Sequence, residues 1–449
     1  MTTGTAGIGR SEFTGRLVGR DDPGYERVRR AAIWNARRPD RFPDLILLAA
    51  DEADVARGVR LAAERGMRVG IRSGGHSWIA NGVRNGGLLI DLSRLTEIRF
   101  DEATGLVALG PAARGAAVDA ALAPFGRFFP TGHAPSVGVG GFLLGGGYGW
   151  NSRVHGPACL SIEAVDVVTA AGEIVRADAD EHPGLLWAAR GCGPGFFGVA
   201  TRFHVRTYRR PPIHRAVRTY PLDRLDEVVT WSQDTAPWLP APLEIAIKIG
   251  APPGEAEKVI TIVGTAFGED GAALLGALAD APFAARTGDG SPSSPITMAE
   301  LYEESGRWSE AGLRWAVDGI WTDGPTDGVV AGTRAMVEAI PGSGSFVFIL
   351  PWGAYRAGVP AAWSVQAANY VSPVAAWTDP ALDDQHRAWV TDTTKAMEPV
   401  SRGVQFSDAD PASRPGPGLS ARSQTRLAAL RRRYDPNRVF TSYLTAADL

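Results

Sequence analysis

Three glycine clusters constrain this chain more than any other feature of its sequence. They are Gly74-Gly75, residues 136–149 (SVGVGGFLLGGGYG) and residues 190–198 (RGCGPGFFG). Because glycine lacks a Cβ, a glycine cluster lets the backbone lie directly against another group. Three such clusters, far apart in the sequence, predict loops that meet around one long partner, such as a phosphate-bearing cofactor held by backbone amides.

Two common nucleotide-binding motifs do not fit these glycines. A dinucleotide fingerprint needs Gly-x-Gly-x-x-Gly, and counted from Gly138 its last glycine falls on Leu143. A P-loop needs Gly-Lys-Ser/Thr, and no lysine lies near any cluster. The glycines therefore indicate a cofactor cradle that uses neither motif.

Length and composition narrow the class of protein. A chain of 449 residues is too long for a single core, so we expect two domains. A net charge of −3 does not favour nucleic acid or an acidic membrane surface. No stretch approaches the roughly 20 apolar residues of a membrane span, and the amino-terminal residues lack a signal-peptide pattern. Two cysteines, Cys159 and Cys192, form neither a disulfide framework nor a metal quartet. We expect a cytoplasmic, metal-free protein without nucleic-acid or membrane partners. Whether it forms a homo-oligomer stays open.

Hydrophobic periodicity changes at Pro211-Pro212. Before this pair, the pattern predicts strands over 45–50, 67–71, 86–95 and 105–111, helices over 51–66 and 113–126, and a hairpin over 162–177. After it, strands are predicted over 243–250, 258–267 and 345–353, and helices near 272–280, 297–305 and 326–339. Ile245, Ile247 and Ile249 share one face of their strand. Near the end, a basic helix with Leu427 and Leu430 on one stripe stops at Pro436.

Taken in order, the motifs resemble one family of flavoproteins. The segments are RSGGHS, LLIDLSRL, PTGHAPSVGVGGFLLGGGYGWNSRVHGPA, AVDVVTAAGEIVRA, LWAARGCGPGFFGVATRF and RRRYDPNRVF. Together they resemble the berberine-bridge-type branch of the vanillyl-alcohol-oxidase-like proteins, which have a PCMH-type FAD-binding domain. The resemblance covers about residues 30–210 and 420–443, while the middle of the chain agrees only in length and general character.

The resemblance implies an α+β fold with two lobes. Residues 1–212 would form the first part of a PCMH-type FAD-binding domain. Residues 213–400 would form an α/β substrate domain, with an antiparallel sheet covered by helices. Residues 401–449 would return to the FAD domain.

The resemblance also implies how FAD is held. In this family the histidine of the Ser-Gly-Gly-His motif bonds covalently to the flavin, and here that histidine is His76. Many members have a second link from a cysteine in a Gly-x-Cys-Pro segment, but Ala134 occupies that position here. A single covalent link through His76 is therefore expected. The singly linked flavin should be a somewhat weaker oxidant than the flavin of doubly linked relatives. The other residues expected to bind the cofactor are Arg72, Ser73, Gly74, Gly75, Ser77, Val137, Gly138, Gly140, Gly141, Gly146, Val165 and Gly198.

The implied chemistry is the oxidation of a small organic molecule, with secondary metabolism as the expected setting. An alcohol or amine carbon would give hydride to the flavin, a base would take a proton, and dioxygen would reoxidise the cofactor to give H2O2. The family's Tyr-x-Asn stretch has Gly403-Val404-Gln405-Phe406 as its nearest counterpart, so its base is missing. Tyr148, Tyr370 and Tyr443 remain as candidates for the base.

Several alternatives stay open. A flavoprotein of this fold could catalyse a cyclisation or an oxygenation with little net oxidation, or could bind an aromatic ligand without turnover. Trp78 could line the substrate side of the site or shield the flavin edge, and His133 could stand near the ring or pack beside Pro135. The arginines at 431–433 are interpreted as a solvated helix face.

Overall fold

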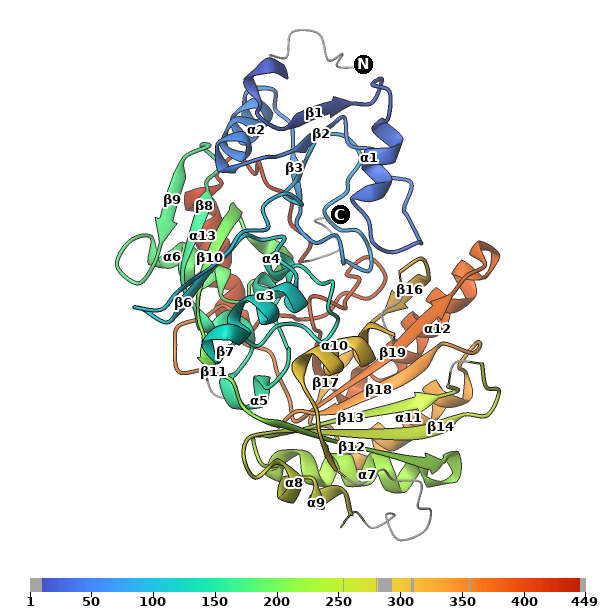
Figure 1. Ribbon diagram of the computed structural model, residues 1–449. Coiled ribbons are helices and arrows are strands. Elements are labelled where there is room, and N and C mark those ends of the chain that lie inside the picture. Colours follow the sequence, from blue (N-terminus) through green and yellow to red (C-terminus); the bar gives the residue numbers. More distant parts are fainter. Residues whose placement is uncertain are drawn as a thin grey trace.

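The chain folds into two lobes of mixed α and β structure, as the sequence predicts (Figure 1). The structure is a computed structural model that describes residues 10–444, except 253, 280, 282–292, 308–310, 354 and 356. The first lobe holds residues from both ends of the described chain, and the second lobe is built around one large sheet.

The first lobe contains a four-stranded and a five-stranded sheet. The four-stranded sheet has the order β1-β2-β4-β3, with parallel pairs β2–β4 and β3–β4; its strands are β1 (Arg16–Gly19), β2 (Leu45–Leu48), β3 (Val69–Arg72) and β4 (Leu88–Asp91). The antiparallel five-stranded sheet has the order β5-β6-β10-β8-β9; its strands are β5 (Ile98–Asp101), β6 (Leu106–Leu109), β8 (Ile162–Val168), β9 (Ile174–Ala177) and β10 (Val199–Arg206). The predicted hairpin over 162–177 is confirmed as the pair β8–β9.

Helix α2 (Glu52–Glu64) shows how the sequence sets these elements. The Asp51 side chain accepts the backbone N–H of Asp54 at the helix start, which satisfies a donor that has no partner within the helix. Val55, Val59 and Ala62 are fully buried against the four-stranded sheet, as the apolar stripe predicts. The other helices of this lobe are α1 (Tyr25–Ala31), α3 (Gly115–Leu122), α4 (Val139–Leu144), α5 (Ser152–His155), α6 (Pro183–Ala189) and α13 (Ala421–Tyr434).

The carboxyl-terminal segment packs onto the first lobe. Helix α13 lies beside α6, with Leu427 buried and the Arg426 guanidinium 4.3 Å above the Trp187 ring. Phe440 then forms a parallel bridge with Val69 beside the four-stranded sheet. We propose on this basis the same division of the chain at residues 212 and 400.

The second lobe is an antiparallel nine-stranded sheet. Its order is β15-β12-β14-β13-β18-β19-β17-β20, and β16 also pairs with β19. The strands are β12 (Ile213–Pro221), β13 (Leu243–Gly250), β14 (Val259–Phe267), β15 (Ser294–Pro295), β16 (Arg314–Val317), β17 (Ile320–Thr322), β18 (Phe346–Pro351), β19 (Asn369–Trp377) and β20 (Ser401–Gly403).

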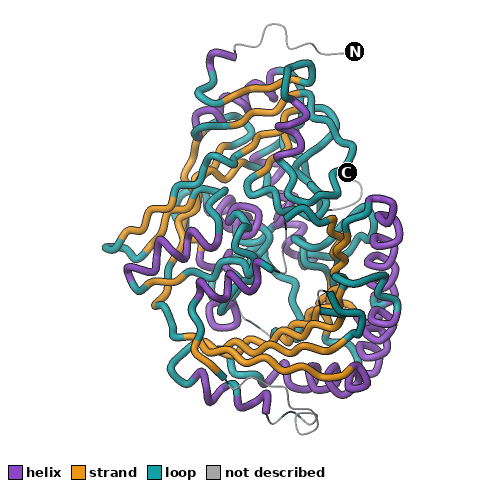
Figure 2. Tube along the Cα trace, turned by 45° about the vertical axis from the view of Figure 1, so that its right-hand side comes forward, coloured by secondary structure: helices purple, strands orange, loops and turns teal. Residues whose placement is uncertain are grey.

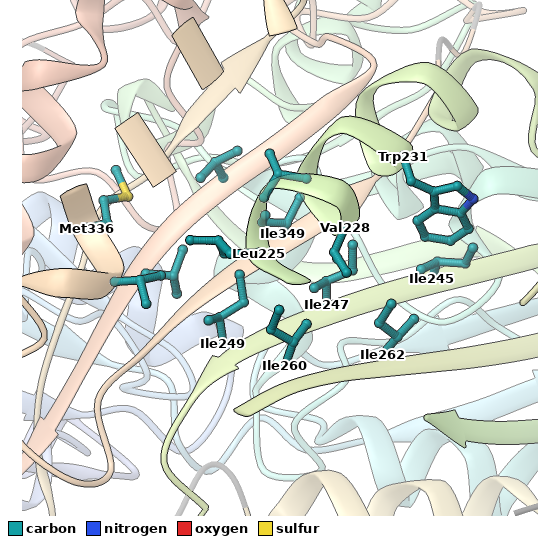
Figure 3. Close-up of a cluster of buried hydrophobic side chains, with 14 of the residues drawn as sticks. Leu225, Val228, Trp231, Ile245, Ile247, Ile249, Ile260, Ile262, Met336 and Ile349 are labelled. Atoms are coloured by element: carbon teal, nitrogen blue, oxygen red, sulfur yellow. The ribbon is translucent and has the colours of Figure 1, made fainter. Parts of the chain in front are cut away.

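Helices cover the outer face of this sheet, away from the first lobe (Figure 2). They include α7 (Leu225–Thr235), α11 (Thr326–Glu338) and α12 (Asp383–Ala396), while α10 (Met298–Gly306) packs beside α3 of the first lobe. Ile245, Ile247 and Ile249 of β13 are buried beneath α7, as the alternating pattern predicts (Figure 3). Alternate residues of β13 must therefore face the other way, toward the first lobe.

One predicted helix is divided. The helical stretch expected near 272–280 is found as α8 (Gly271–Leu274) followed by α9 (Gly276–Ala279), and residue 280 lies outside the described part of the chain. Helical structure in this region is therefore confirmed, with Leu275 between the two short helices.

Candidate functional site

A large cavity lies between the two lobes. Its volume is about 680 Å³, within the size range of small-molecule sites. One wall is made by the loops after β3 and around α4, and the opposite wall by the inner face of the nine-stranded sheet. The cavity is therefore bounded by the glycine clusters on one side and by strand residues on the other.

His76 reaches this cavity from the loop that follows β3. Its ring stacks on Trp34 with centroids 4.5 Å apart, and both rings line the cavity. Burial, together with the nearby charges of Arg114 and Arg72, lowers the pKa of His76 to about 4, against a backbone hydrogen bond at Ser136 that raises it. The imidazole is therefore neutral at physiological pH and has a free lone pair, which makes it a nucleophile.

The glycines of this wall have two different roles. A Cβ on Gly74 would lie 2.6 Å from the backbone N of Gly138, and a Cβ on Gly138 would lie 2.8 Å from the Cα of Gly74. These two glycines therefore let the two loops touch each other. Gly141 is different, because a Cβ there would meet no described atom within 4 Å, and Gly141 lines the cavity. Its exposed backbone is the part of the wall that a cofactor can approach.

Most of the residues expected to bind the cofactor line the cavity. Those that do are Arg72, Ser73, Gly74, Gly75, His76, Ser77, Val137, Gly138, Gly140, Gly141 and Gly198. Gly146 instead packs against Trp363, and Val165 is fully buried in the core beneath the five-stranded sheet.

Tyr370 is the candidate base with an acidic partner. It lies on β19, and its hydroxyl donates a 2.7 Å hydrogen bond to Oδ2 of Asp408. The indole N–H of Trp78 donates to Oδ1 of the same carboxylate at 3.0 Å. Burial raises the pKa of Asp408 in spite of these two donors, and burial together with the Asp408 charge raises the pKa of Tyr370. All three side chains line the cavity.

The other two tyrosines also line the cavity, but the hydroxyl of each hydrogen-bonds to a neutral group. The hydroxyl of Tyr148 accepts a 2.6 Å hydrogen bond from the indole of Trp363, and burial raises its pKa. Tyr443 shares a 2.7 Å hydrogen bond with the Thr441 hydroxyl, and its ring lies beneath the Arg84 guanidinium. Neither phenol is placed beside a group that could take its proton.

A buried ion pair supports the position of Tyr370. Arg414 donates two 2.6 Å hydrogen bonds to the carboxylate of Asp318, and both side chains are at most 5% exposed. The next residue, Gly319, lies so close to Tyr370 that a Cβ there would be 2.3 Å from the tyrosine hydroxyl. The backbone held by this ion pair therefore fixes the space available to the phenol.

The inner face of β13 places charged residues in the opposite wall. Glu244 and Lys248 both line the cavity, as β13 alternation requires. Glu244 accepts the backbone N–H of Ser152 at 3.1 Å and lies 3.9 Å from His133. Burial lowers the pKa of Lys248 to about 7, and its ammonium lies 4.0 Å from the centre of the Phe346 ring.

Sequence reasoning missed Asp408 and Lys248. For Lys248 a signal exists, because the isoleucine pattern that predicts the buried face of β13 also places Lys248 on the other face. For Asp408 the local sequence offers none, since the residue lies in a proline-rich loop 330 residues from Trp78.

The open Gly141 backbone, the neutral His76 and the size of the cavity fit FAD. No cluster of three or more potential metal ligands occurs in the part of the chain that the structure describes. Among the helices of the described residues, none has the length and apolar character to cross a bilayer.

Comparison with known proteins supports FAD as the cofactor. Residues 43–178 match the family described as the FAD binding domain. The chain is 30% identical over 423 residues to the FAD-linked oxidoreductase nodO of Hypoxylon pulicicidum, covering 92% of this chain and 93% of the relative. It is 35% identical over 197 residues to (R)-6-hydroxynicotine oxidase of Paenarthrobacter nicotinovorans, covering 44% and 42% of the two chains. The structure of BBE-like 1 from Physcomitrella patens superposes with a TM-score of 0.84 at 21% identity, covering 97% and 98%, and so shares the fold.

Proposed function

Because this chain belongs to the FAD-linked oxidoreductases, we propose that it is an oxidase acting on an alcohol or amine carbon of a small organic molecule, in the setting of secondary metabolism. Bound FAD would supply the hydride acceptor and pass the electrons to dioxygen, giving H2O2. The observation that carries the proposal is the Tyr370–Asp408 pair, which offers a proton acceptor to a molecule in the cavity.

We propose that His76 forms the only covalent link to FAD. The neutral imidazole supports this role, because a protonated ring could not form the bond. Ala134 lines the cavity where the family's second link would arise. Cys159 and Cys192 are fully buried in a hydrophobic cluster, and burial raises the pKa of both thiols, so neither forms a nucleophilic thiolate.

Tyr370 and Asp408 would move the substrate proton together. Tyr370 would accept the proton of the substrate O–H or N–H while its own phenolic proton passes to Asp408 along the 2.7 Å hydrogen bond. The raised pKa of Asp408 favours this transfer, because a more basic carboxylate holds the arriving proton better. Trp78 orients the carboxylate from its other oxygen.

Removal of Tyr370 or Asp408 tests the base. Tyr370→Phe and Asp408→Asn should each lower kcat by about 10²–10⁴-fold, the usual contribution of a general base. The measurement is H2O2 release, together with anaerobic bleaching of the flavin, over a panel of aromatic alcohols and amines. Tyr434→Phe on α13, whose residue does not line the cavity, is the matched control. Wild-type protein that neither bleaches nor releases H2O2 with any compound contradicts the oxidase function, and variants as fast as wild type contradict the base.

The pH profile tests Trp78 separately. The Trp78 hydrogen bond lowers the pKa of Asp408, so Trp78→Phe should raise it. Since Asp408 must be ionised to accept a proton, the acid limb of kcat/KM should move to higher pH in the variant. An unmoved acid limb would show that Asp408 is not the group that limits the rate at low pH.

A further inference from the structure

The cavity has a polar end where the two lobes meet, formed by His133 and Glu244. His133 comes from the loop before α4 in the first lobe, and Glu244 comes from β13 on the inner face of the nine-stranded sheet. Nε2 of His133 lies 3.9 Å from Oε2 of Glu244, which is too far for a direct hydrogen bond. One oxygen atom at about 2.8 Å from each of them would bridge this gap.

Other contacts hold both side chains in place. Oε1 of Glu244 accepts the backbone N–H of Ser152 at 3.1 Å, so Oε2 is the oxygen on the His133 side. The Trp150 ring meets the imidazole edge-on, with centroids 4.3 Å apart. The Ser305 hydroxyl donates a 2.7 Å hydrogen bond to the backbone carbonyl of His133. The two groups are therefore oriented before a ligand arrives, which lowers the entropic cost of binding.

The charge next to Glu244 is balanced. Burial lowers the pKa of Arg153 and the charge of Glu244 opposes this shift, so the two charges lie close enough to interact. The Arg153 guanidinium itself donates to backbone carbonyls, those of Leu239, Pro240, Leu243 and Trp352. A charged ligand group would disturb this balance, whereas a neutral group that both donates and accepts would not. A hydroxyl is such a group.

The sheet register relates this polar end to the proposed base. Ala246 of β13 lies level with Leu350 of β18, and Leu350 pairs with Tyr370 of β19. Glu244 lies two residues along β13 from Ala246, and all four residues line the cavity. With strands about 4.8 Å apart and about 3.4 Å per residue, the backbones of Glu244 and Tyr370 are about 12 Å apart. Ala246 and Leu350 supply an apolar surface between them on which flat rings can lie.

We propose that Glu244 and His133 bind a hydroxyl group at the far end of a flat, apolar substrate whose oxidised carbon lies beside Tyr370, an inference that rests on the oxidase function proposed above. The hydroxyl would donate to Oε2 of Glu244 and accept from Nε2 of His133, and so fill the 3.9 Å gap. Because a hydrogen bond to a carboxylate is stronger than one between neutral groups, this end of the cavity selects hydroxylated molecules.

Equilibrium dialysis of the holoenzyme against 2-naphthol and 2-fluoronaphthalene tests this site. The two compounds differ only in the hydroxyl group, and neither has an alcohol or amine carbon to oxidise, so binding is measured without turnover. At pH 7 the wild type should bind 2-naphthol about tenfold more tightly than 2-fluoronaphthalene, as expected for a hydrogen bond to a charged group.

Variants of the two residues separate binding from packing. Glu244→Gln keeps the shape of the side chain and should lose about tenfold in affinity for 2-naphthol and little for 2-fluoronaphthalene. His133→Phe keeps a ring against Trp150 but removes Nε2, and should lose about threefold for 2-naphthol alone. Glu338→Gln, on the exposed side of α11, is the matched control.

The outcomes distinguish this site from the oxidase function. Wild-type protein that binds the two compounds equally, or binds neither, overturns the inference, because the gap would then hold water only. Glu244→Gln that binds 2-naphthol as wild type does, or weakens both compounds equally, also overturns it. A wild type that prefers 2-naphthol but releases no H2O2 with any compound would refute the oxidase function while leaving the hydroxyl site standing.

Discussion

Replacing Lys248 by methionine should make the folded protein more stable, and most of all at low pH. In the folded chain burial lowers the pKa of Lys248 from 10.5 to about 7. The Lys248 side chain therefore binds its proton more tightly in the unfolded chain than in the folded chain. As pH falls from about 10.5 to about 7, this difference lowers the free energy of unfolding of the wild type, and the loss is complete below that range. Methionine carries no proton and avoids this loss.

The magnitude follows from the two pKa values. Each pKa unit of difference between the folded and unfolded chain corresponds to about 1.4 kcal/mol. At pH 6 the free energy of unfolding of the wild type is therefore lower than that of an uncharged equivalent by up to about 5 kcal/mol. At pH 9, where the folded-state amine is already neutral, the same calculation gives about 2 kcal/mol. The free energy of unfolding gained by the variant should therefore shrink by about 3 kcal/mol between pH 6 and pH 9.

Urea unfolding of the holoenzymes, followed by tryptophan fluorescence, measures this difference. Wild type and Lys248→Met are compared at pH 6, 7.5 and 9, with Lys395→Met as a control in which the exposed lysine should give no pH-dependent gain. A gain that is equal at all three values, or a variant less stable than wild type at pH 6, would refute the account of Lys248 as a desolvated ammonium. The expected result identifies a residue whose charge costs stability, which is common at functional sites.

The other predictions concern the cofactor and the base. His76→Ala should leave the fold intact but release FAD on denaturation, so the flavin fluorescence should disappear from the protein band on a denaturing gel under ultraviolet light. In a peptide map of the wild type, the flavin should be found on the peptide that contains His76. Gly141→Ala should weaken FAD retention with little loss of stability, because its Cβ meets no described protein atom within 4 Å, and an unchanged flavin content would show that the cofactor does not approach there. Gly319→Ala should keep FAD but lower kcat, because its Cβ would lie 2.3 Å from the Tyr370 hydroxyl and would displace the phenol; unchanged H2O2 release would contradict this.

The sequence was sufficient for elements whose signal is local. The apolar stripe of α2, with Asp51 before it, predicts both the helix and its buried face. The alternation in β13 predicts that its isoleucines are buried on one side. Helices α8 and α9 show the limit of this approach, since the pattern predicts a helical stretch there but not its division at Leu275.

The glycine clusters were predicted to meet around one partner, and the structure adds a distinction that the sequence could not contain. Composition treats every glycine of a cluster alike, yet Gly74 and Gly138 pack against each other while Gly141 faces the cavity. The difference depends on which loops meet, which is a property of the tertiary fold. Substitution at Gly74 should therefore disturb loop packing first, and substitution at Gly141 should disturb the ligand first.

The proposed base shows why this part of the site is harder to predict from the sequence than the cofactor part. A cofactor cradle is made of continuous loops, so its residues are neighbours in the sequence as well as in space. The proposed proton acceptor is made of Trp78, Tyr370 and Asp408, which come from a loop in the first lobe, a strand in the second and the segment that joins them. In the sequence each of the three residues has an ordinary structural interpretation: Trp78 as a packed indole, Tyr370 as a strand residue and Asp408 as a loop carboxylate. Only their two hydrogen bonds to one carboxylate, made across the lobes, give the group a chemical role. A site assembled this way should tolerate changes in local sequence but not changes in how the two lobes meet.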